Sequence, residues 1–188
     1  MNLKQLSKLQ SAENFAKEQN SDMANDKKIL HHEHLASVVA RLKNLGVTDE
    51  DVISSAWLHD ILDETKISFE ELDQRFGSKV AVIILAISRD RNLPKLKQEE
   101  QYVKQLKESA FNSKLIKLCD ISANLKDLKN THLSKTKKAK EAKKNLFYLN
   151  VIKSDLIKNK SQIPGIVSLI NGINDTVMAY GLRPIVLQ

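Results

Sequence analysis

Histidine and acidic side chains gather in two parts of the sequence, and both side-chain types bind divalent cations. Three of the five histidines lie at positions 31, 32 and 34, and a fourth begins the adjacent pair His59-Asp60. An imidazole nitrogen beside a carboxylate oxygen suits a borderline or hard divalent cation. A His-Asp pair also occurs often by chance, so the residues around it decide how much weight it carries.

Two more carboxylates follow this pair, because Asp63 and Glu64 lie three and four residues after Asp60. On a helix, all three carboxylates would share one side within about one turn. Like charges in this arrangement repel one another, and a bound cation would relieve the repulsion. An acidic helix end at the surface explains the pattern equally well, so both interpretations stay open here.

A second candidate cluster lies in residues 114–128, K-L-I-K-L-C-D-I-S-A-N-L-K-D-L. Lys117, Asp120 and Asn124 follow one another at i, i+3 and i+7, on a face next to an inward stripe of leucines. Asp120 is therefore either the ion-pair partner of Lys117 or a metal ligand. This segment alone favours the ion pair.

Helices are the elements that must position these residues, because apolar residues recur with helical periodicity along most of the chain. Thr48 with Asp51 predicts one helix start, and Ser68 with Glu71 forms a capping box at another. Leu3, Leu6 and Leu9 indicate an amphipathic N-terminal helix. The other expected helices cover residues 34–45, 48–60, 69–76, 80–87, 99–108, 113–129, 135–158 and 166–180.

Two segments give less regular signals. Residues 80–87 have the β-branched content of a strand, but no convincing partner strand exists, so we expect a fully buried helix. Residues 89–97 contain Pro94 and are expected to form an irregular connection. Without a linker or an internal repeat, residues 1–188 are expected to form one all-α domain.

Composition restricts the setting and the partners. The lone Cys119 cannot form an intrachain disulfide, and the longest apolar run is far below the roughly 20 residues of a membrane span. We therefore expect a cytoplasmic protein without membrane contact. The net charge of +7 favours an anionic partner. The lysines of residues 135–144 are interpreted as a solvated helix face, and without interleaved aromatic residues nucleic acid is not the expected partner.

The order His34, His59-Asp60, Asp120 reproduces the H…HD…D pattern of the HD superfamily. The flanking stretches H-L-A-S-V-V-A-R-L, W-L-H-D-I-L-D-E-T, L-P-K and K-L-I-K-L-C-D-I-S-A-N-L-K-D-L resemble the hydrolase domain of the Rel/SpoT-homologue family. The stand-alone small alarmone hydrolases are the most similar members. The resemblance covers about residues 12–153 and implies an HD-domain helical bundle, with the last predicted helix outside it.

The resemblance also implies a set of roles. His34, His59, Asp60 and Asp120 would bind one divalent metal ion, usually Mn²⁺. Asp63 and Glu64 would handle the nucleophilic water and its proton. Substrate contacts would come from Lys95, Asn124, Lys144 and Tyr148. The implied reaction is manganese-dependent removal of pyrophosphate from the 3′ position of the nucleotide (p)ppGpp, which leaves GDP from ppGpp.

Three departures from the family pattern keep alternatives open. Residues 24–33 lack the Arg, Gly and Tyr that help family members to hold the base, although Lys27 and Lys28 offer charge. The usual Glu-Asp pair is reversed as Asp63-Glu64, and Ile121 replaces a usual basic residue. The alternatives are a phosphohydrolase acting on another nucleotide or NADPH, and a non-catalytic nucleotide-binding HD protein.

Overall fold

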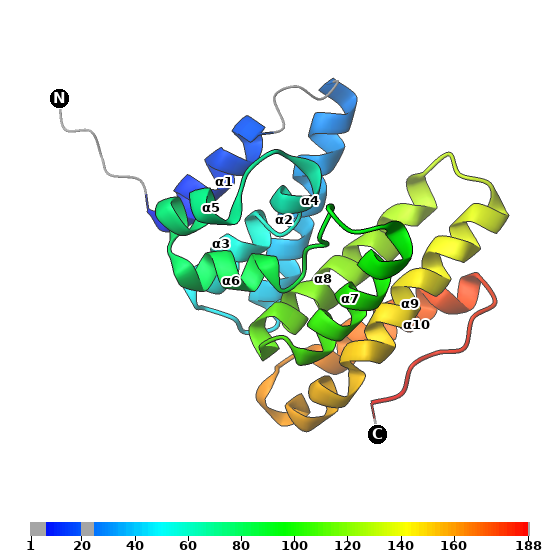
Figure 1. Cartoon of the computed structure of the whole chain (residues 1–188). Coiled ribbons are helices and arrows are strands. Elements are labelled where there is room, and N and C mark those ends of the chain that lie inside the picture. The colour runs from blue at the N-terminus through cyan, green and yellow to red at the C-terminus, as the bar shows by residue number, and fades with distance from the viewer. Residues whose placement is uncertain (1–6, 20–24, 188) are drawn as a thin grey trace.

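The computed structural model describes residues 7–19 and 25–187, and all the regular structure in these residues is helical (Figure 1). The elements are α1 (Lys8–Gln19), α2 (Asn25–Asn44), α3 (Glu50–Trp57), α4 (Ile61–Glu64), α5 (Phe69–Phe76), α6 (Ser78–Leu85), α7 (Lys95–Glu108), α8 (Phe111–Asp127), η1 (Leu128–Asn130), α9 (Lys135–Lys158), η2 (Lys160–Gln162) and α10 (Ile166–Ala179). Leu9 lies in α1, whereas the predicted helical positions Leu3 and Leu6 fall outside the described residues.

Local capping explains where two of the shorter helices begin. The Ser68 side chain accepts the N–H of Glu71 at 3.2 Å, so the predicted start of α5 is confirmed. The predicted start at Thr48 is one residue early. Asp49 caps α3 instead, because its Oδ1 accepts the N–H of Asp51 at 2.9 Å. Both caps satisfy backbone donors that have no partner within the helix.

The His59-Asp60 pair lies in a turn, and not within a helix as predicted. The helix α3 ends at Trp57, and α4 begins at Ile61. His59 Nδ1 lies 2.9 Å from the carbonyl oxygen of Ala56, so the imidazole binds the end of α3. In this turn, His59 contacts Asp120, whereas Asp60 contacts His31.

Residues 80–87 are helical through α6, as predicted, but the helix is not fully buried. Val80 and Ile84 are completely buried, whereas Val82 and Leu85 are 55% and 45% exposed. A helix at the surface buries only one stripe of its side chains. In α6, apolar residues also occupy the face that points to solvent. The predicted irregular connection is shorter than expected, because α7 already begins at Lys95, directly after Pro94.

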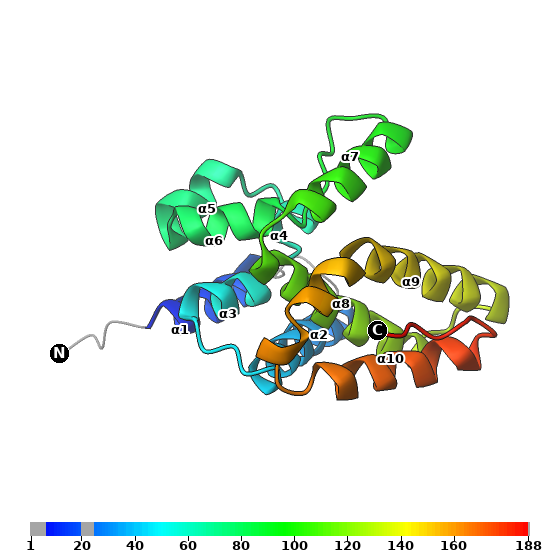
Figure 2. The same ribbon diagram turned by 90° about the horizontal axis from the view of Figure 1, so that it is seen from below.

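The helices pack around one hydrophobic core, which makes this a single domain. The helix α2 packs against α3 and α8, and α8 also contacts α9 and α10. Leu118, Cys119 and Ile121 of α8 are fully buried in this core. Figure 2 shows α5, α6 and α7 as a layer on one side of these helices. The packing brings α2, the turn after α3 and α8 together, and these carry the candidate metal ligands.

No helix among the described residues has the length and apolar character needed to cross a membrane.

Candidate metal centre and adjoining pocket

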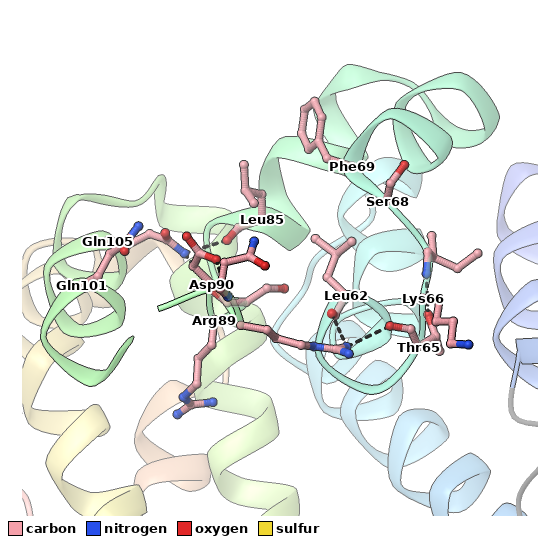
Figure 3. A pocket seen from close by; sticks show the side chains of 14 residues that line it. Leu62, Thr65, Lys66, Ser68, Phe69, Leu85, Arg89, Asp90, Gln101 and Gln105 are labelled. Atoms are coloured by element: carbon pink, nitrogen blue, oxygen red, sulfur yellow. Dashed lines mark hydrogen bonds between the residues drawn. The ribbon is translucent and has the colours of Figure 1, made fainter. Parts of the chain in front are cut away.

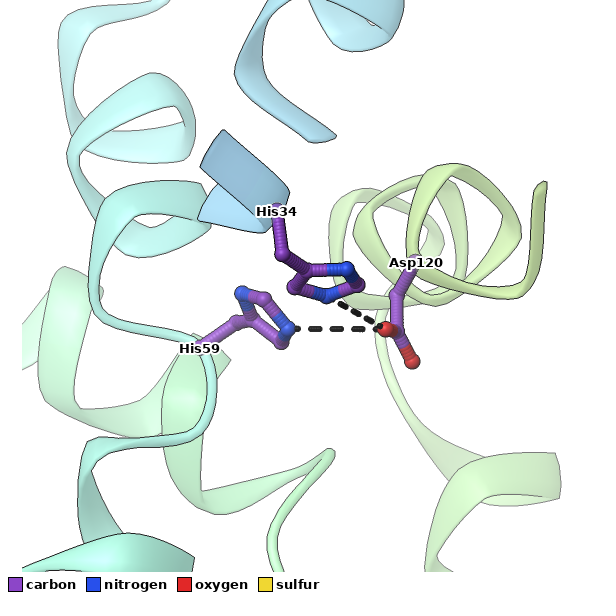
Figure 4. Close-up of side chains that lie close together, drawn as sticks. All are labelled: His34, His59 and Asp120. Atoms are coloured by element: carbon purple, nitrogen blue, oxygen red, sulfur yellow. Dashed lines mark ion pairs between the residues drawn. The ribbon is translucent and has the colours of Figure 1, made fainter. Parts of the chain in front are cut away.

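Two imidazoles and one carboxylate meet between α2, the turn after α3 and α8 (Figure 4). One ligand atom from each of His34, His59 and Asp120 lies within 4.8 Å of the others. Asp120 Oδ1 is 3.3 Å from Nε2 of His34 and 3.6 Å from Nε2 of His59. Three of the four predicted ligands are therefore gathered at one point, although they are far apart in the sequence.

The second nitrogen of each imidazole fixes the ring. His59 Nδ1 lies 2.9 Å from the Ala56 carbonyl oxygen, which can only accept, so Nδ1 carries the proton and Nε2 is the nitrogen with a lone pair for a metal ion. His34 Nδ1 lies 3.2 Å from Oδ2 of Asp127 and is held in the same way. An oxygen acceptor on the second ring nitrogen is typical of metal-binding histidines. With two nitrogen ligands and a carboxylate, the site fits a divalent transition-metal ion.

Electrostatics keep Asp120 ionised despite its burial. Burial by itself would raise the pKa of Asp120, but the ammonium of Lys117 and the two imidazoles outweigh it and hold the pKa well below its usual range. Burial opposes charge on His34 as well, yet its bonds to Asp120 and Asp127 raise its pKa to about 9. The Lys117–Asp120 ion pair, at 2.8 Å, is present together with the imidazole contacts. The two interpretations of Asp120 are thus compatible.

Asp60, the fourth predicted ligand, lies at the edge of this group. Its Oδ2 is 3.4 Å from Nε2 of His31, and its charge helps to raise the pKa values of His34 and His59. His31 therefore contacts Asp60 and not the three-residue cluster itself. His32 stacks on Trp57 with ring centroids 5.4 Å apart, so it packs away from the three-residue cluster.

The two acidic residues proposed to handle water differ in their surroundings. Asp63 is partly buried, and its Oδ1 accepts the backbone N–H of Arg89 at 2.9 Å. Burial raises the pKa of Asp63 and outweighs the contact with Arg89. Glu64 is exposed. Of the two, Asp63 is therefore the carboxylate whose surroundings favour binding of a proton.

A pocket of about 290 Å³ adjoins the three-residue cluster. Three of the four predicted substrate residues line it, and Lys95 does not. Lys95 is the exposed first residue of α7 and contributes nothing to this wall. The lining residues include Asn124, Lys144, Tyr148, Arg89, Lys117 and Asp127.

The pocket and the cluster share contacts through α8. Asn124 Nδ2 donates to Asp120 Oδ1 at 2.7 Å, and Lys117 binds the other oxygen of Asp120. Asp127 both lines the pocket and holds His34. A ligand in the pocket would therefore lie beside the candidate metal ligands.

Arg89 is a pocket residue that sequence reasoning missed. Its Nη2 donates to the hydroxyl of Tyr148 at 2.8 Å, and that hydroxyl donates to Glu99 at 2.6 Å. Its guanidinium also lies 4.2 Å from the ring centroid of Tyr102. No motif pointed to Arg89, because it lies in the irregular connection. Asp127 was also missed, although its position seven residues after Asp120 places both on one helix face.

Arg91, in the same connection, anchors the short helix that carries Asp63. Its Nη2 donates to the carbonyl oxygens of Leu62 and Thr65, the latter at 2.9 Å. These residues belong to the wall of a separate, open cavity of about 550 Å³. Figure 3 shows Arg89 turned away from Ser68 and Phe69 in this cavity, which agrees with its contacts to Tyr148.

Comparison with known proteins agrees with this geometry. Residues 9–149 match the family model described as HD domain. A Danio rerio protein named guanosine-3′,5′-bis(diphosphate) 3′-pyrophosphohydrolase MESH1 is 40% identical over 96 residues, which are 50% of this chain and 53% of that protein. The human protein of the same name is 36% identical over 83 residues, 44% of this chain and 46% of that protein. The chain thus spans about half the length of the curated relatives it matches.

Solved structures support the fold. One, described as "A metazoan ortholog of SpoT hydrolyzes ppGpp and plays a role in starvation responses", superposes with a TM-score of 0.74 at 22% identity, covering 95% of this chain and 98% of that chain. A crystal structure of a Listeria monocytogenes protein gives a TM-score of 0.58 at 18% identity, with 77% and 99% covered. The predicted all-α HD-domain bundle is confirmed. This chain belongs to the HD-domain family.

Proposed function

We propose that the protein is a metal-dependent phosphohydrolase that removes pyrophosphate from the 3′ position of ppGpp or pppGpp. The observation that carries the proposal is the convergence of two imidazole Nε2 atoms and the Asp120 carboxylate beside a pocket with several cationic side chains. The names of the curated relatives supply the substrate class. Mn²⁺ is the proposed ion, and the cytoplasm the proposed location.

The proposed ligands are His34, His59 and Asp120, with Asp60 as the fourth. A divalent ion held there would supply Lewis-acid chemistry, which makes water more acidic and polarises phosphoryl oxygens. The protein's own contribution is to present these ligands already oriented, since Ala56 and Asp127 fix the two rings.

Asp63 is the proposed proton acceptor. Its carboxylate is held in place by the Arg89 N–H, and its raised pKa brings it closer to the range of an effective general base. Water loses a proton to Asp63, and the water oxygen then bonds to the phosphorus that is attached to the 3′ oxygen. The bond between this phosphorus and the 3′ oxygen breaks. The 3′ oxygen takes up a proton from solvent and Asp63 later returns its own proton to solvent, so the products from ppGpp are GDP and pyrophosphate.

The pocket is suited to hold the phosphates. Lys144 and the Arg89 guanidinium contribute positive charge, and Asn124 adds an amide at the same wall. The Tyr148 hydroxyl, which donates to Glu99, accepts from Arg89 and so holds the guanidinium in place. Positive groups fixed in advance stabilise charge that grows on phosphate oxygens during the reaction. Lys117 is already paired with Asp120, so its main effect is on the metal ligand.

A second candidate substrate follows from the segment before His34. Residues 24–33 lack the side chains with which family members hold guanine, so another nucleotide or NADPH is the alternative substrate. A panel of ppGpp, pppGpp, GTP and NADPH, incubated with Mn²⁺ and analysed by ion-exchange chromatography, distinguishes these cases. The proposal predicts fastest turnover of ppGpp or pppGpp and at least a hundredfold loss in Asp63→Asn. Faster cleavage of NADPH would correct the substrate, and absence of any cleavage with metal bound would favour the non-catalytic alternative.

A further inference from the structure

A cavity of about 560 Å³ lies between α2, α8 and α10, away from the candidate metal centre. It shares no lining residue with the 290 Å³ pocket. The helix α8 separates the two, since Asn124 and Asp127 line the smaller pocket, whereas Ser122 and Lys126 line this cavity. Figure 2 shows α10 passing beside α2 and α8. Because α10 follows residue 149, one wall lies outside the segment matched to the HD family.

Arg41 presents a partly buried positive charge to this cavity. Its Nε donates to Oγ of Ser122 at 3.1 Å, and its Nη1 donates to the carbonyl oxygen of Ser37 at 2.9 Å and to the Ser37 hydroxyl. These acceptors are all neutral. No carboxylate of the described residues lies within ion-pair distance of the guanidinium, and Asp127 attracts it only from further away. Arg41 is thus a cation without a directly bound counter-charge.

Partial burial makes an unpaired guanidinium energetically unfavourable when no anion is bound. It lowers the pKa of Arg41, an effect that its more distant acidic neighbour does not cancel. Buried charges in proteins are normally paired or bind a ligand. Arg41 also bridges α2 and α8, the helices that carry His34 and Asp120, so a counter-ion there would lie between two helices of the metal centre.

Two further cations extend the positive charge. Lys126 and Lys129 line the cavity, and the one lining carboxylate, Asp175, leaves a local excess of positive charge. A planar guanidinium with nearby ammonium groups suits the tetrahedral oxygens of a phosphate. The volume falls within the range of about 300–1,000 Å³ that is usual for small-molecule sites.

We propose that this cavity is a second anion site that binds the phosphate group of a small phosphorylated metabolite through Arg41, Lys126 and Lys129. The site does not depend on the proposed hydrolase activity. It is therefore tested by binding to the metal-free protein, with inorganic phosphate as the probe.

The glycines provide a selective readout. The sequence has five, of which Gly165 and Gly172 line the cavity, while Gly77 lies at the junction of α5 and α6. No glycine lines the 290 Å³ pocket. In protein labelled with ¹⁵N-glycine, phosphate titrated at constant ionic strength is expected to shift the amide signals of Gly165 and Gly172 along one saturating curve. The Gly77 signal should stay in place.

Two sets of variants identify the site. Lys126→Gln combined with Lys129→Gln removes two exposed charges and should weaken phosphate binding at least tenfold without affecting the fold. The matched control Lys144→Gln removes a charge from the other pocket and should leave the Gly165 curve unchanged.

Gly172→Met should fill the cavity. A Cβ at this position meets no atom within 4 Å, and a side chain in place of glycine favours the helix. Gly165 should then no longer respond to phosphate. The proposal is overturned if Gly165 and Gly172 shift no more than Gly77, if their shifts do not saturate, or if the double lysine variant and Gly172→Met bind phosphate like the wild type.

Discussion

The buried ammonium of Lys114 joins α7, α8 and α9. Leaving this ammonium without its carboxylate partner should destabilise the protein more than removing the ammonium itself. Lys114 Nζ donates to Oδ2 of Asp155 at 2.5 Å and to the carbonyl oxygen of Lys107 at 2.8 Å, so it connects α8 to α9 and α7. The Lys114 side chain is 6% exposed and that of Asp155 is 28% exposed. Asp155 therefore compensates a charge that water scarcely reaches.

Asp155→Asn should be the more damaging of two substitutions. Breaking a buried ion pair from one side costs about 3–5 kcal/mol, because the other charge stays buried without its partner. The partial exposure of Asp155 and the acceptor retained by asparagine reduce this, so we expect a loss of about 2–3 kcal/mol in the free energy of unfolding. Lys114→Met removes the buried charge itself and leaves a side chain of similar length. Its main cost is the lost bond to Lys107, about 1 kcal/mol.

The effect of pH gives a second test with a definite sign. The hydrogen bond from Lys114 holds the pKa of Asp155 below its ordinary value. A carboxylate with a lowered pKa in the folded state stabilises the protein above its unfolded pKa of about 3.9, and this contribution is lost as pH falls toward the folded value. The penalty of Asp155→Asn should therefore be full at pH 7 and smaller at pH 3.

Urea denaturation followed by circular dichroism at both pH values measures these differences. Lys158→Met is the matched control, because Lys158 contacts the same carboxylate at 3.8 Å from a side chain that is 73% exposed. It should leave the free energy of unfolding nearly unchanged. If Asp155→Asn is no more destabilising than Lys114→Met, or if its penalty does not shrink in acid, the reasoning about the buried ammonium is refuted.

Three further outcomes are expected. Asp127→Asn should weaken Mn²⁺ binding about 10- to 100-fold in calorimetry, because the carboxylate orients His34, while thermal stability stays close to wild type; unchanged affinity would contradict this role. Tyr148→Phe should raise KM for ppGpp about tenfold, because the charged Arg89 of the pocket loses the hydroxyl that holds it, a contact worth about 1.5–3 kcal/mol; unaltered initial-rate kinetics would contradict this positioning role. Leu118→Ala should lower the free energy of unfolding by about 2–5 kcal/mol in urea denaturation through a buried cavity, and a loss below 1 kcal/mol would contradict full burial.

Local signals in the sequence were sufficient to predict most of the helices. The Ser68 cap depends on residues within four positions, and the structure confirms it. The turn at His59 could not be predicted in this way, because the imidazole takes the Ala56 carbonyl that would otherwise continue the helix. The exposure of Val82 also depends on which neighbours cover α6, and apolar content alone cannot show this.

Some residues of the candidate site could likewise be predicted from the sequence, and others could not. The motif that resembles the HD family predicted His34, His59 and Asp120, and the structure brings these three together. Arg89 could not be found, since its role follows from how the connection before α7 lies against Tyr148. Lys95 was predicted from resemblance, but it lies outside the pocket because α7 begins there and turns it outward.

The most direct test is a titration of the metal-free protein with Mn²⁺ in the presence of ppGpp, with GDP and pyrophosphate quantified together. We predict equal amounts of the two products, activity that saturates at one metal ion per chain, and loss of activity with a chelator or in His34→Ala. Intact ppGpp although one Mn²⁺ per chain is bound would contradict the proposed reaction. Full turnover by His34→Ala would contradict the proposed site.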